Sequence, residues 1–311
     1  MDSKQFLKQS KKITAPFRVT DGKKFRLRKY DTAETLGFES DDKPAAQEAL
    51  ACGVQLLTKL QDKLYAQDRW ALLLIFQAMD AAGKDSAIKH VMSGVNPQGC
   101  EVYSFKVPTS EDLDHDYLWR CAKRLPERGR IGIFNRSYYE ETLVVRVHQE
   151  YLAGQKLPQQ LIGKNIWNQR FQDISNFERY LTRNGIVVVK FFLHVSQDEQ
   201  KKRFLERIEN PAKNWKFSLG DVHERQHWED YMEAYEATIQ NTATKYAPWY
   251  VVPADNKWFT RLVVSSAVVE TMSSLDLDYP KLNKDELKEL EASRLALLEK
   301  NKEAGGCQRM R

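Results

Sequence analysis

The segment FQAMDAAGKDSAIKH, residues 76–90, combines a Gly-Lys pair with two acidic residues. It approaches the phosphate-binding pattern G-x-x-x-x-G-K-[ST], but Ala78 stands at the first glycine and Asp85 at the hydroxyl position. In such a loop, backbone N–H groups and a lysine bind phosphate oxygens at the start of a helix. Gly83 and Lys84 keep the pair that this binding needs, so we interpret the segment as an altered phosphate loop. Because Ala78 lacks the conformational freedom of glycine, we expect a shifted backbone there.

Two carboxylates distinguish this loop from an ordinary phosphate site. Asp80 lies inside the loop and Asp85 follows the lysine. Each would repel bound phosphate unless a divalent cation lay between them. The two acids therefore indicate a magnesium site, a base that activates a hydroxyl group, or both. The alternative is a plain strand-to-helix turn that carries a Gly-Lys pair by chance.

A second motif, RIGIFNRSYYEE at residues 130–141, places polar residues directly after an apolar run. Open α/β sheets bind ligands at the carboxyl ends of their strands, where Asn135 and Arg136 would lie. A guanidinium there can hold a phosphoryl group through two hydrogen bonds. Glu140 and Glu141 follow within reach of a cation, although acids are also favoured at a helix start by the helix dipole.

A charged segment at residues 196–220 is interrupted by Asn210-Pro211, and we interpret it as a lid over the site. Its bases suit a substrate with many phosphates, although the acids between them also suit i,i+4 ion pairs. The residues expected to bind phosphate or nucleotide come from the loop, the second motif and this segment. They are Ala81, Ala82, Gly83, Lys84, Asp85, Ser86, Lys89, Asn135, Arg136, Lys201, Arg203, Arg207, Lys213 and Lys216.

The elements that must position these residues follow the rhythm of an α/β protein. Longer amphipathic stretches, including 45–67 and one long helix over 220–246, alternate with apolar runs bounded by turn signals. That alternation is typical of a parallel sheet covered by helices. The predicted strands are 70–77, 101–106, 130–135, 186–195 and 249–252.

We expect one main domain with an extension at each end. The predicted parts are a basic N-terminal extension at 1–40, a main domain at 41–280 with its lid at about 196–220, and a C-terminal docking or oligomer helix with a tail at 281–311. The lysines and arginines of the first thirty residues predict a solvated arm.

Composition is that of a soluble globular protein: 311 residues, 42% hydrophobic, 29% charged and a net charge of +5. No run approaches the roughly 18 apolar residues that cross a bilayer, and no signal-peptide core opens the chain. We therefore expect a cytoplasmic protein without membrane or nucleic-acid partners. Cys52, Cys100, Cys121 and Cys307 lack C-x-x-C spacing, which predicts reduced thiols.

Four stretches together resemble the polyphosphate kinase 2 family: AMDAAGKDSAIKHVMSGVNPQG, GIFNRSYYEE, GDVHERQHWEDYMEAYEAT and APWYVVPADNKWFTR. The resemblance extends from about residue 29 to residue 275. The loop of that family is expected to read G-x-D-x-x-G-K-D or G-x-D-x-x-G-K-G. Asp80, Lys84 and Asp85 match this pattern, and only Ala78 departs from it.

The resemblance implies a P-loop kinase fold with three α/β/α layers, a five-stranded parallel sheet and a helical lid. It implies transfer of phosphoryl groups between inorganic polyphosphate and AMP or ADP, forming ADP or ATP, with Mg²⁺ or Mn²⁺ as cofactor. Asp80, Lys84 and Arg136 would be catalytic. Asp80 and Glu140 would hold the metal, and Lys89 with the lid bases would line the polyphosphate path.

Asn135 with Glu140 resembles the subgroup that accepts both nucleoside mono- and diphosphates. Many relatives carry Asp at the position of Asn135, and an amide supplies no negative charge, so Glu140 is the expected metal ligand. We further expect a homo-oligomer, either a dimer or a tetramer.

Three other functions compete with this interpretation. HERQH at residues 223–227 fits the H-E-x-x-H zinc-protease pattern, but no later histidine supplies a third ligand. An ATP-dependent nucleoside monophosphate kinase would share the fold and the loop, and the basic lid and Asp85 argue against it. A non-catalytic polyanion-binding P-loop protein would use the basic N-terminal segment as its contact surface.

Overall fold

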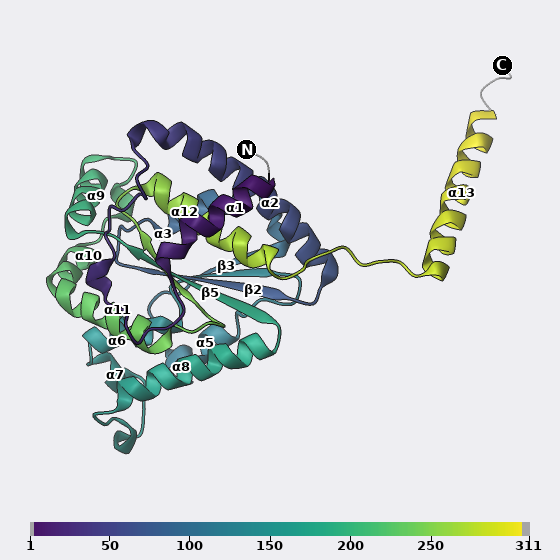
Figure 1. Ribbon diagram of the computed structural model, residues 1–311. Helices are drawn as coiled ribbons and strands as arrows, with labels where there is room; N and C mark the ends of the chain where they lie inside the picture. The colour runs from purple at the N-terminus through teal and green to yellow at the C-terminus, as the bar shows by residue number, and fades with distance from the viewer. Residues whose placement is uncertain (1–2, 307–311) are drawn as a thin grey trace. The chain divides into compact units, whose positions relative to one another are not determined.

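The computed structural model describes residues 3–306, and the chain divides into two units, Met1–Leu277 and Asp278–Arg311. Cys307 lies outside the described residues. The first unit is built around a six-stranded sheet in the order β1-β6-β5-β2-β4-β3 (Figure 1). The strands are β1 Arg18–Val19, β2 Ala71–Ala78, β3 Cys100–Ser104, β4 Ile131–Asn135, β5 Ile186–His194 and β6 Trp249–Pro253.

Five of the six strands are parallel and correspond to the five predicted apolar runs. β2 lies between β5 and β4, and all eight of its residues are buried because helices cover both faces of the sheet. The α/β class and the parallel sheet are thus confirmed. β1 pairs antiparallel with β6 over only two residues, which is too short to leave a pattern in the sequence.

Helices form a layer on each face of the sheet (Figure 1). The first layer holds α1 Ser3–Thr14, α2 Lys43–Gln67, α3 Lys84–Val91 and α12 Lys257–Ser273, and the second holds α8 Ile166–Arg183 and α11 Trp228–Thr242. The other helices of this unit are α4 Ser110–Leu113, α5 Trp119–Ala122, α6 Val144–Val147, α7 Tyr151–Gly154, α9 Gln197–Glu209 and α10 Leu219–Glu224. No helix among residues 3–306 is long and apolar enough to cross a membrane.

The second unit contains the helix α13 Lys284–Gly306, where the sequence predicts one. Its leucines, Leu287, Leu290, Leu295, Leu297 and Leu298, are exposed.

The basic start of the chain packs on the fold and is not a solvated arm, so that expectation is wrong. Phe6 and Ile13 of α1 and Phe17 after it are buried, and α1 lies against α12. The lysines on the other face of α1, Lys4, Lys8, Lys11 and Lys12, are exposed. Apolar residues spaced along one helix face, rather than the charge of the segment, determine its place.

The single helix expected over 220–246 is broken in the structure. α10 ends at Glu224, a 3₁₀ turn covers Arg225–His227, and α11 begins at Trp228. The Glu224 carboxylate accepts hydrogen bonds from Tyr231 (2.7 Å) and contacts His148 (3.0 Å). Arg225 donates to the carbonyl of Gln197 at 3.0 Å. These tertiary contacts outweigh the helical propensity of the segment.

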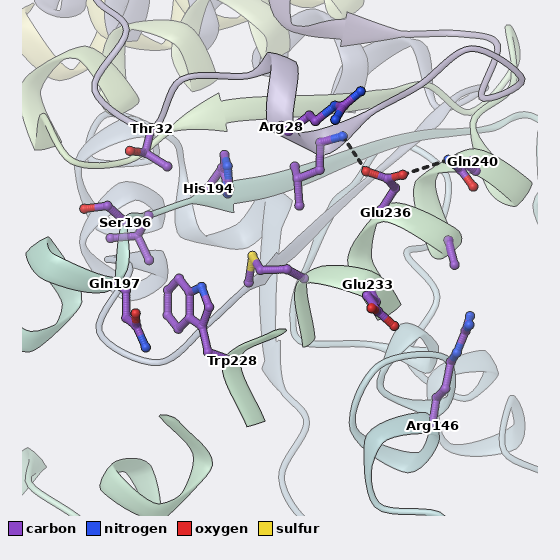
Figure 2. Close-up of a pocket in the computed structure, with 14 residues that line it drawn as sticks. Arg28, Thr32, Arg146, His194, Ser196, Gln197, Trp228, Glu233, Glu236 and Gln240 are labelled. Atoms are coloured by element: carbon purple, nitrogen blue, oxygen red, sulfur yellow. Dashed lines mark hydrogen bonds between the residues drawn. The ribbon is translucent and has the colours of Figure 1, made fainter. Parts of the chain in front are cut away.

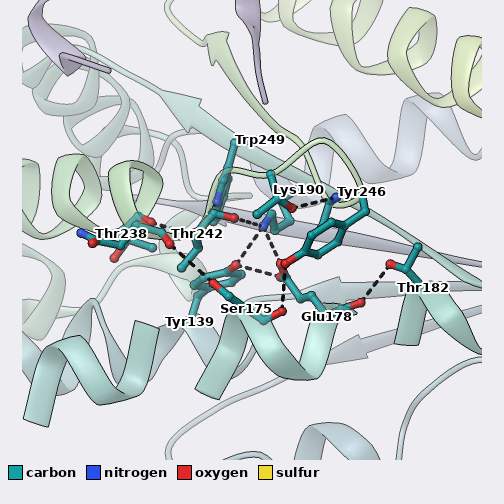
Figure 3. A network of polar contacts seen from close by, with 12 residues as sticks. Tyr139, Ser175, Glu178, Thr182, Lys190, Thr238, Thr242, Tyr246 and Trp249 are labelled. Atoms are coloured by element: carbon teal, nitrogen blue, oxygen red, sulfur yellow. Dashed lines mark hydrogen bonds and ion pairs between the residues drawn. The ribbon is translucent and has the colours of Figure 1, made fainter. Parts of the chain in front are cut away.

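A buried ion pair joins the sheet to the second helical layer (Figure 3). Lys190 of β5 and Glu178 of α8 are both 0% exposed, and the ammonium lies 2.6 Å from the carboxylate. Lys190 Nζ also donates to the Tyr139 hydroxyl (3.0 Å) and to the Thr242 carbonyl (2.9 Å), so its three donors are all used. Tyr138 and Tyr139 donate to the other carboxylate oxygen. The network therefore fixes the 3₁₀ turn Tyr138–Glu141, which ends the second sequence motif.

Removing one partner of this pair is expected to destabilise the protein strongly. In Lys190→Met the Glu178 carboxylate stays buried without its cation, so the free energy of unfolding falls by about 3–5 kcal/mol. Adding Glu178→Gln removes the stranded charge but keeps an acceptor for the tyrosines, and recovers most of the loss. Urea unfolding of the full chain measures both variants.

Lys202→Met is the matched control, because Lys202 is exposed and pairs with Glu199 at 3.6 Å on the surface. It should change the free energy of unfolding by less than about 0.5 kcal/mol. A loss of less than about 1 kcal/mol in Lys190→Met would show that the buried pair does not hold the layers together.

Candidate functional site

The altered phosphate loop joins β2 to α3 at the carboxyl edge of the sheet. Among the described residues of the loop, positive φ angles occur at Ala81 (61°) and Gly83 (106°), and not at Ala78. Ala78 is the last residue of β2 and pairs with Leu193 of β5. The expectation of a shifted backbone at Ala78 is therefore wrong, and the loop turns where Ala81 and Gly83 allow it.

Lys84 begins α3 and points back across the loop. Its Nζ donates to the carbonyl of Ala78 at 2.8 Å, and the side chain is buried. Burial first, and then the nearby Arg136, lower the pKa of Lys84 to about 8, and Asp80, Glu140 and Asp85 act against this shift. A buried ammonium of this kind gains much from an anion that enters the site.

Arg136 brings the second motif to the loop. Its φ is 65°, and its backbone N–H donates to the carbonyl of Phe76 at 3.0 Å, which ties the turn after β4 to β2. The guanidinium lies between two acids, with Nη2 2.7 Å from Asp80 Oδ1 and Nη1 3.0 Å from Glu140 Oε2. Glu140 first, and then Asp80, hold the pKa of Arg136 above its ordinary value, against the effect of burial.

The two motifs also meet through a hydrogen bond between an amide and a carboxylate. Asn135 Nδ2 donates to Asp85 Oδ1 at 2.7 Å, so the acid that follows the loop lysine is turned toward the end of β4. Asp80, Lys84, Arg136 and Glu140, which the sequence places in two separate motifs, thus form one cluster. The catalytic and metal-binding roles assigned to them remain predictions.

Asp80, Lys84 and Arg136 of the cluster line a cavity of about 510 Å³, and half of its lining residues are lysines or arginines. From the predicted set, the structure places these residues on its wall: Asp80, Ala81, Gly83, Lys84, Asp85, Ser86, Asn135, Arg136, Arg203, Arg207, Lys213 and Lys216. Arg207 also lies 3.5 Å from Asp221, whose pKa is raised by burial and by Asp80.

Three residues of the predicted phosphate-binding set do not line the cavity, and one of them is the buried Ala82 of the loop. Lys89 on α3 and Lys201 on α9 are exposed and do not line the cavity. Arg203 lines the cavity, but its donors are directed at protein carbonyls and at Glu199.

The structure adds bases that sequence reasoning missed. Lys106 follows β3, and Lys257 and Arg261 lie in the first turns of α12, after β6. Arg261 Nη2 donates to the Ser86 hydroxyl at 2.9 Å, next to the phosphate loop. A signal was present for Lys106, because it ends a predicted strand as Asn135 does, whereas Lys257 and Arg261 lie beyond the strand predicted at 249–252.

The HERQH segment does not form a zinc site. The helix break at Glu224 separates His223 from His227, and the ring of His227 packs 4.8 Å from that of His148. Within the described part of the chain, no three His, Cys, Asp or Glu side chains gather closely enough to hold a metal ion. Among residues 3–306 the pattern therefore lacks the third ligand of a zinc-protease site.

A second cavity of about 550 Å³ lies between the N-terminal segment, the end of β5 and α11 (Figure 2). Trp228 and Met232 form part of its wall, and Glu236 accepts a hydrogen bond from the backbone N–H of Leu27 at 2.8 Å. The cavity contains none of the predicted phosphate ligands. Cavity volume therefore does not indicate which of the two cavities is the candidate phosphate site. The phosphate loop and the bases beside it indicate the cavity of about 510 Å³.

The donor set of the cluster suits a magnesium ion. Asp80 and Glu140 present carboxylate oxygens on both sides of Arg136. Mg²⁺ prefers hard oxygen ligands and is usually held by one or two carboxylates together with substrate phosphates and water. A site with few protein carboxylates and many phosphate-binding bases fits that mode.

Comparisons with known proteins agree with this geometry. The sequence profile described as "Polyphosphate kinase 2 (PPK2)" matches residues 40–280. An ADP-polyphosphate phosphotransferase of Rhodopseudomonas palustris is 52% identical over 286 residues, which cover 92% of this chain and 98% of the relative. An AMP/ADP-polyphosphate phosphotransferase of Meiothermus ruber is 46% identical over 265 residues, covering 85% and 95%.

A solved structure is similar as well. The crystal structure of polyphosphate kinase 2 from Arthrobacter aurescens TC1 superposes with a TM-score of 0.83 at 38% identity. The match covers 92% of this chain and 96% of that one.

The lowered pKa of Lys84 predicts a pH-dependent affinity for anions. Sulfate keeps its charge above neutral pH, so only the protein titrates. The dissociation constant of the sulfate complex should rise about tenfold per pH unit once the pH exceeds about 8, because the Lys84 ammonium loses its proton there. Calorimetric titration from pH 7 to pH 10 measures this. Lys84→Arg keeps its charge throughout and should lose the slope, whereas an unchanged affinity in the wild type would place Lys84 outside the anion site.

Proposed function

The chain belongs to the polyphosphate kinase 2 family, and we propose that it transfers phosphoryl groups between inorganic polyphosphate and ADP or AMP. The observation that carries the proposal is the single cluster of Lys84, Arg136 and two carboxylates at the end of a cavity lined with bases. Phosphoryl transfer needs positioning and charge neutralisation, and these are the groups that supply both.

The transfer itself exchanges one phosphorus–oxygen bond for another. An oxygen of the terminal nucleotide phosphate forms a bond to the end phosphorus of polyphosphate, the bridging P–O bond breaks, and the polyphosphate leaves one unit shorter. Lys84 and Arg136 neutralise charge on the oxygens of the group that moves. The acceptor oxygen is already ionised at neutral pH, so the site needs no strong general base.

A Mg²⁺ ion, or Mn²⁺ in its place, would be held by Asp80 and Glu140 together with phosphate oxygens. The ion would neutralise phosphate charge when bound. In the structure both carboxylates are occupied by Arg136. Arg136 therefore holds the two acids in place and prevents their mutual repulsion before substrates bind.

The acceptor class is proposed from the second motif and from the relatives. One relative is described as an ADP-polyphosphate phosphotransferase and another as an AMP/ADP-polyphosphate phosphotransferase. Asn135 is neutral and donates to Asp85, so the end of β4 carries one negative charge fewer than it would with Asp. This favours an acceptor site that tolerates both AMP and ADP.

A lid, a homo-oligomer and a cytoplasmic location are part of the same proposal. Arg207 of α9, with Lys213 and Lys216 at the 3₁₀ turn between α9 and α10, lines the cavity, which supports a lid over polyphosphate. The exposed leucines of α13 support a homo-oligomer, dimer or tetramer. A cytoplasmic location would give the enzyme access to its nucleotides.

Product analysis with separate AMP, ADP and GDP acceptors tests the function. With polyphosphate, Mg²⁺ and no ATP, we expect the protein to form ADP from AMP and ATP from ADP. Chromatography separates and quantifies these products. Lys84→Ala and Arg136→Ala should each lower kcat at least about 100-fold, because each removes charge stabilisation in a partly desolvated site.

Lys201→Ala is the control for charge alone, because Lys201 is exposed and away from the cavity. It should stay within about twofold of the wild type. Product formation only when ATP replaces polyphosphate would support a nucleoside monophosphate kinase instead. Full activity in both site variants would place the chemistry elsewhere.

A further inference from the structure

Two side chains of α9 bind three consecutive carbonyl groups of the phosphate loop. Gln200 Nε2 donates to the carbonyl of Asp80 at 2.9 Å. Arg203, one turn further along α9, donates through Nη1 to the carbonyls of Ala81 (3.1 Å) and Ala82 (2.8 Å). Both side chains are buried, with Gln200 1% and Arg203 4% exposed.

Arg203 has no donor left for a phosphate. A guanidinium carries five N–H donors. Nη1 uses its two on the loop, and Nη2 donates to the carbonyls of Ala254 (2.7 Å) and Asp255 (3.0 Å) after β6. The remaining donor, Nε, bonds Glu199 at 2.8 Å. The residue that the sequence suggests as a polyphosphate ligand is fully engaged in joining two loops to α9.

The amide of Gln200 is itself oriented by an arginine that follows α10. Arg225, in the 3₁₀ turn after α10, donates to Gln200 Oε1 at 2.6 Å and to the carbonyl of Gln197 at 3.0 Å. With its oxygen held on that side, the amide presents its N–H to the carbonyl of Asp80. Arg225 of the HERQH segment therefore contacts the phosphate loop through Gln200.

Holding the carbonyls fixes the direction of the N–H groups. In a trans peptide the C=O and the following N–H point in opposite directions, and no described peptide is cis. The N–H groups of Ala81 and Gly83 therefore point away from α9, while that of Ala82 donates to the carbonyl of Met79 within the loop. Ala81 also has a left-handed φ of 61°, which costs an L-residue about 1–2 kcal/mol and needs support from its surroundings.

We propose that Gln200 and Arg203 form a carbonyl clamp, positioning residues that aim the phosphate-loop N–H groups at the phosphate and contact no substrate themselves. The inference rests on the proposed function for the phosphate that the loop binds. It also links the lid to the loop, because Arg225, Gln200 and Asp80 are connected in series.

Hydrogen–deuterium exchange of the substrate-free full chain tests the clamp without activity. Arg203→Lys keeps the charge but loses the planar fork, and Gln200→Glu keeps an acceptor for Arg225 but loses the donor to Asp80. In both variants the peptide containing residues 79–84 should exchange at least about tenfold faster, while peptides of β2 and β5 exchange as in the wild type. Lys202→Met, exposed on the same helix, should change neither.

Steady-state kinetics separates a clamp from a phosphate ligand. Misaimed N–H groups lower stabilisation of the transferring phosphate, so kcat should fall about 10- to 100-fold with the KM for polyphosphate within about threefold. The kcat of Arg203→Ala should be no lower than that of Arg203→Lys. A raised KM with kcat preserved, or unchanged loop exchange in Arg203→Lys, would overturn the proposal. Faster loop exchange in a chain whose wild type transfers no phosphate would support the clamp and contradict the proposed function.

Discussion

The site depends on holding two cations close together, the buried Lys84 and the half-buried Arg136. Burial and the charge of Arg136 both act against the ammonium of Lys84, and its pKa falls to about 8. Asp80 and Glu140 offset this by binding both ends of the Arg136 guanidinium. The same four groups are those that phosphoryl transfer needs, because cations bind the phosphate oxygens and carboxylates bind a metal. Substrates therefore replace one set of ionic contacts with another.

Contacts outside the cluster hold these charged side chains in position. The buried pair of Lys190 with Glu178 anchors the turn after β4 through Tyr138 and Tyr139, directly after Arg136 in the chain. On the other side, α9 holds the carbonyls of the phosphate loop. One face of the site is thus fixed by an interior ion pair and the other by the helix that begins the lid. Neither set of contacts leaves its polar groups without partners.

Sequence patterns predicted what is local and missed what the topology brings together. Parallel strands buried on both faces are continuous apolar runs, so β2, β4, β5, β6 and the loop at the end of β2 could be found. β3 is a largely exposed edge strand, and the turn signal before it indicated its place. Lys106, Lys257 and Arg261 join the site only because the strands before them end at one edge. The sequence predicts phosphate binding by Arg203 because a base in the lid can donate to phosphate or to backbone carbonyls. Only the three-dimensional structure distinguishes these two roles. The break after Glu224 likewise follows from tertiary contacts.

The most direct test of the account follows a labelled phosphate through the reaction. Polyphosphate labelled in its terminal phosphate is mixed with ADP, Mg²⁺ and the full chain, and the products are separated by chromatography. If the cluster transfers the phosphoryl group directly between two bound phosphates, the label appears in the γ-phosphate of ATP in proportion to the polyphosphate consumed. Label that appears only as free orthophosphate, with no labelled ATP, would contradict the account.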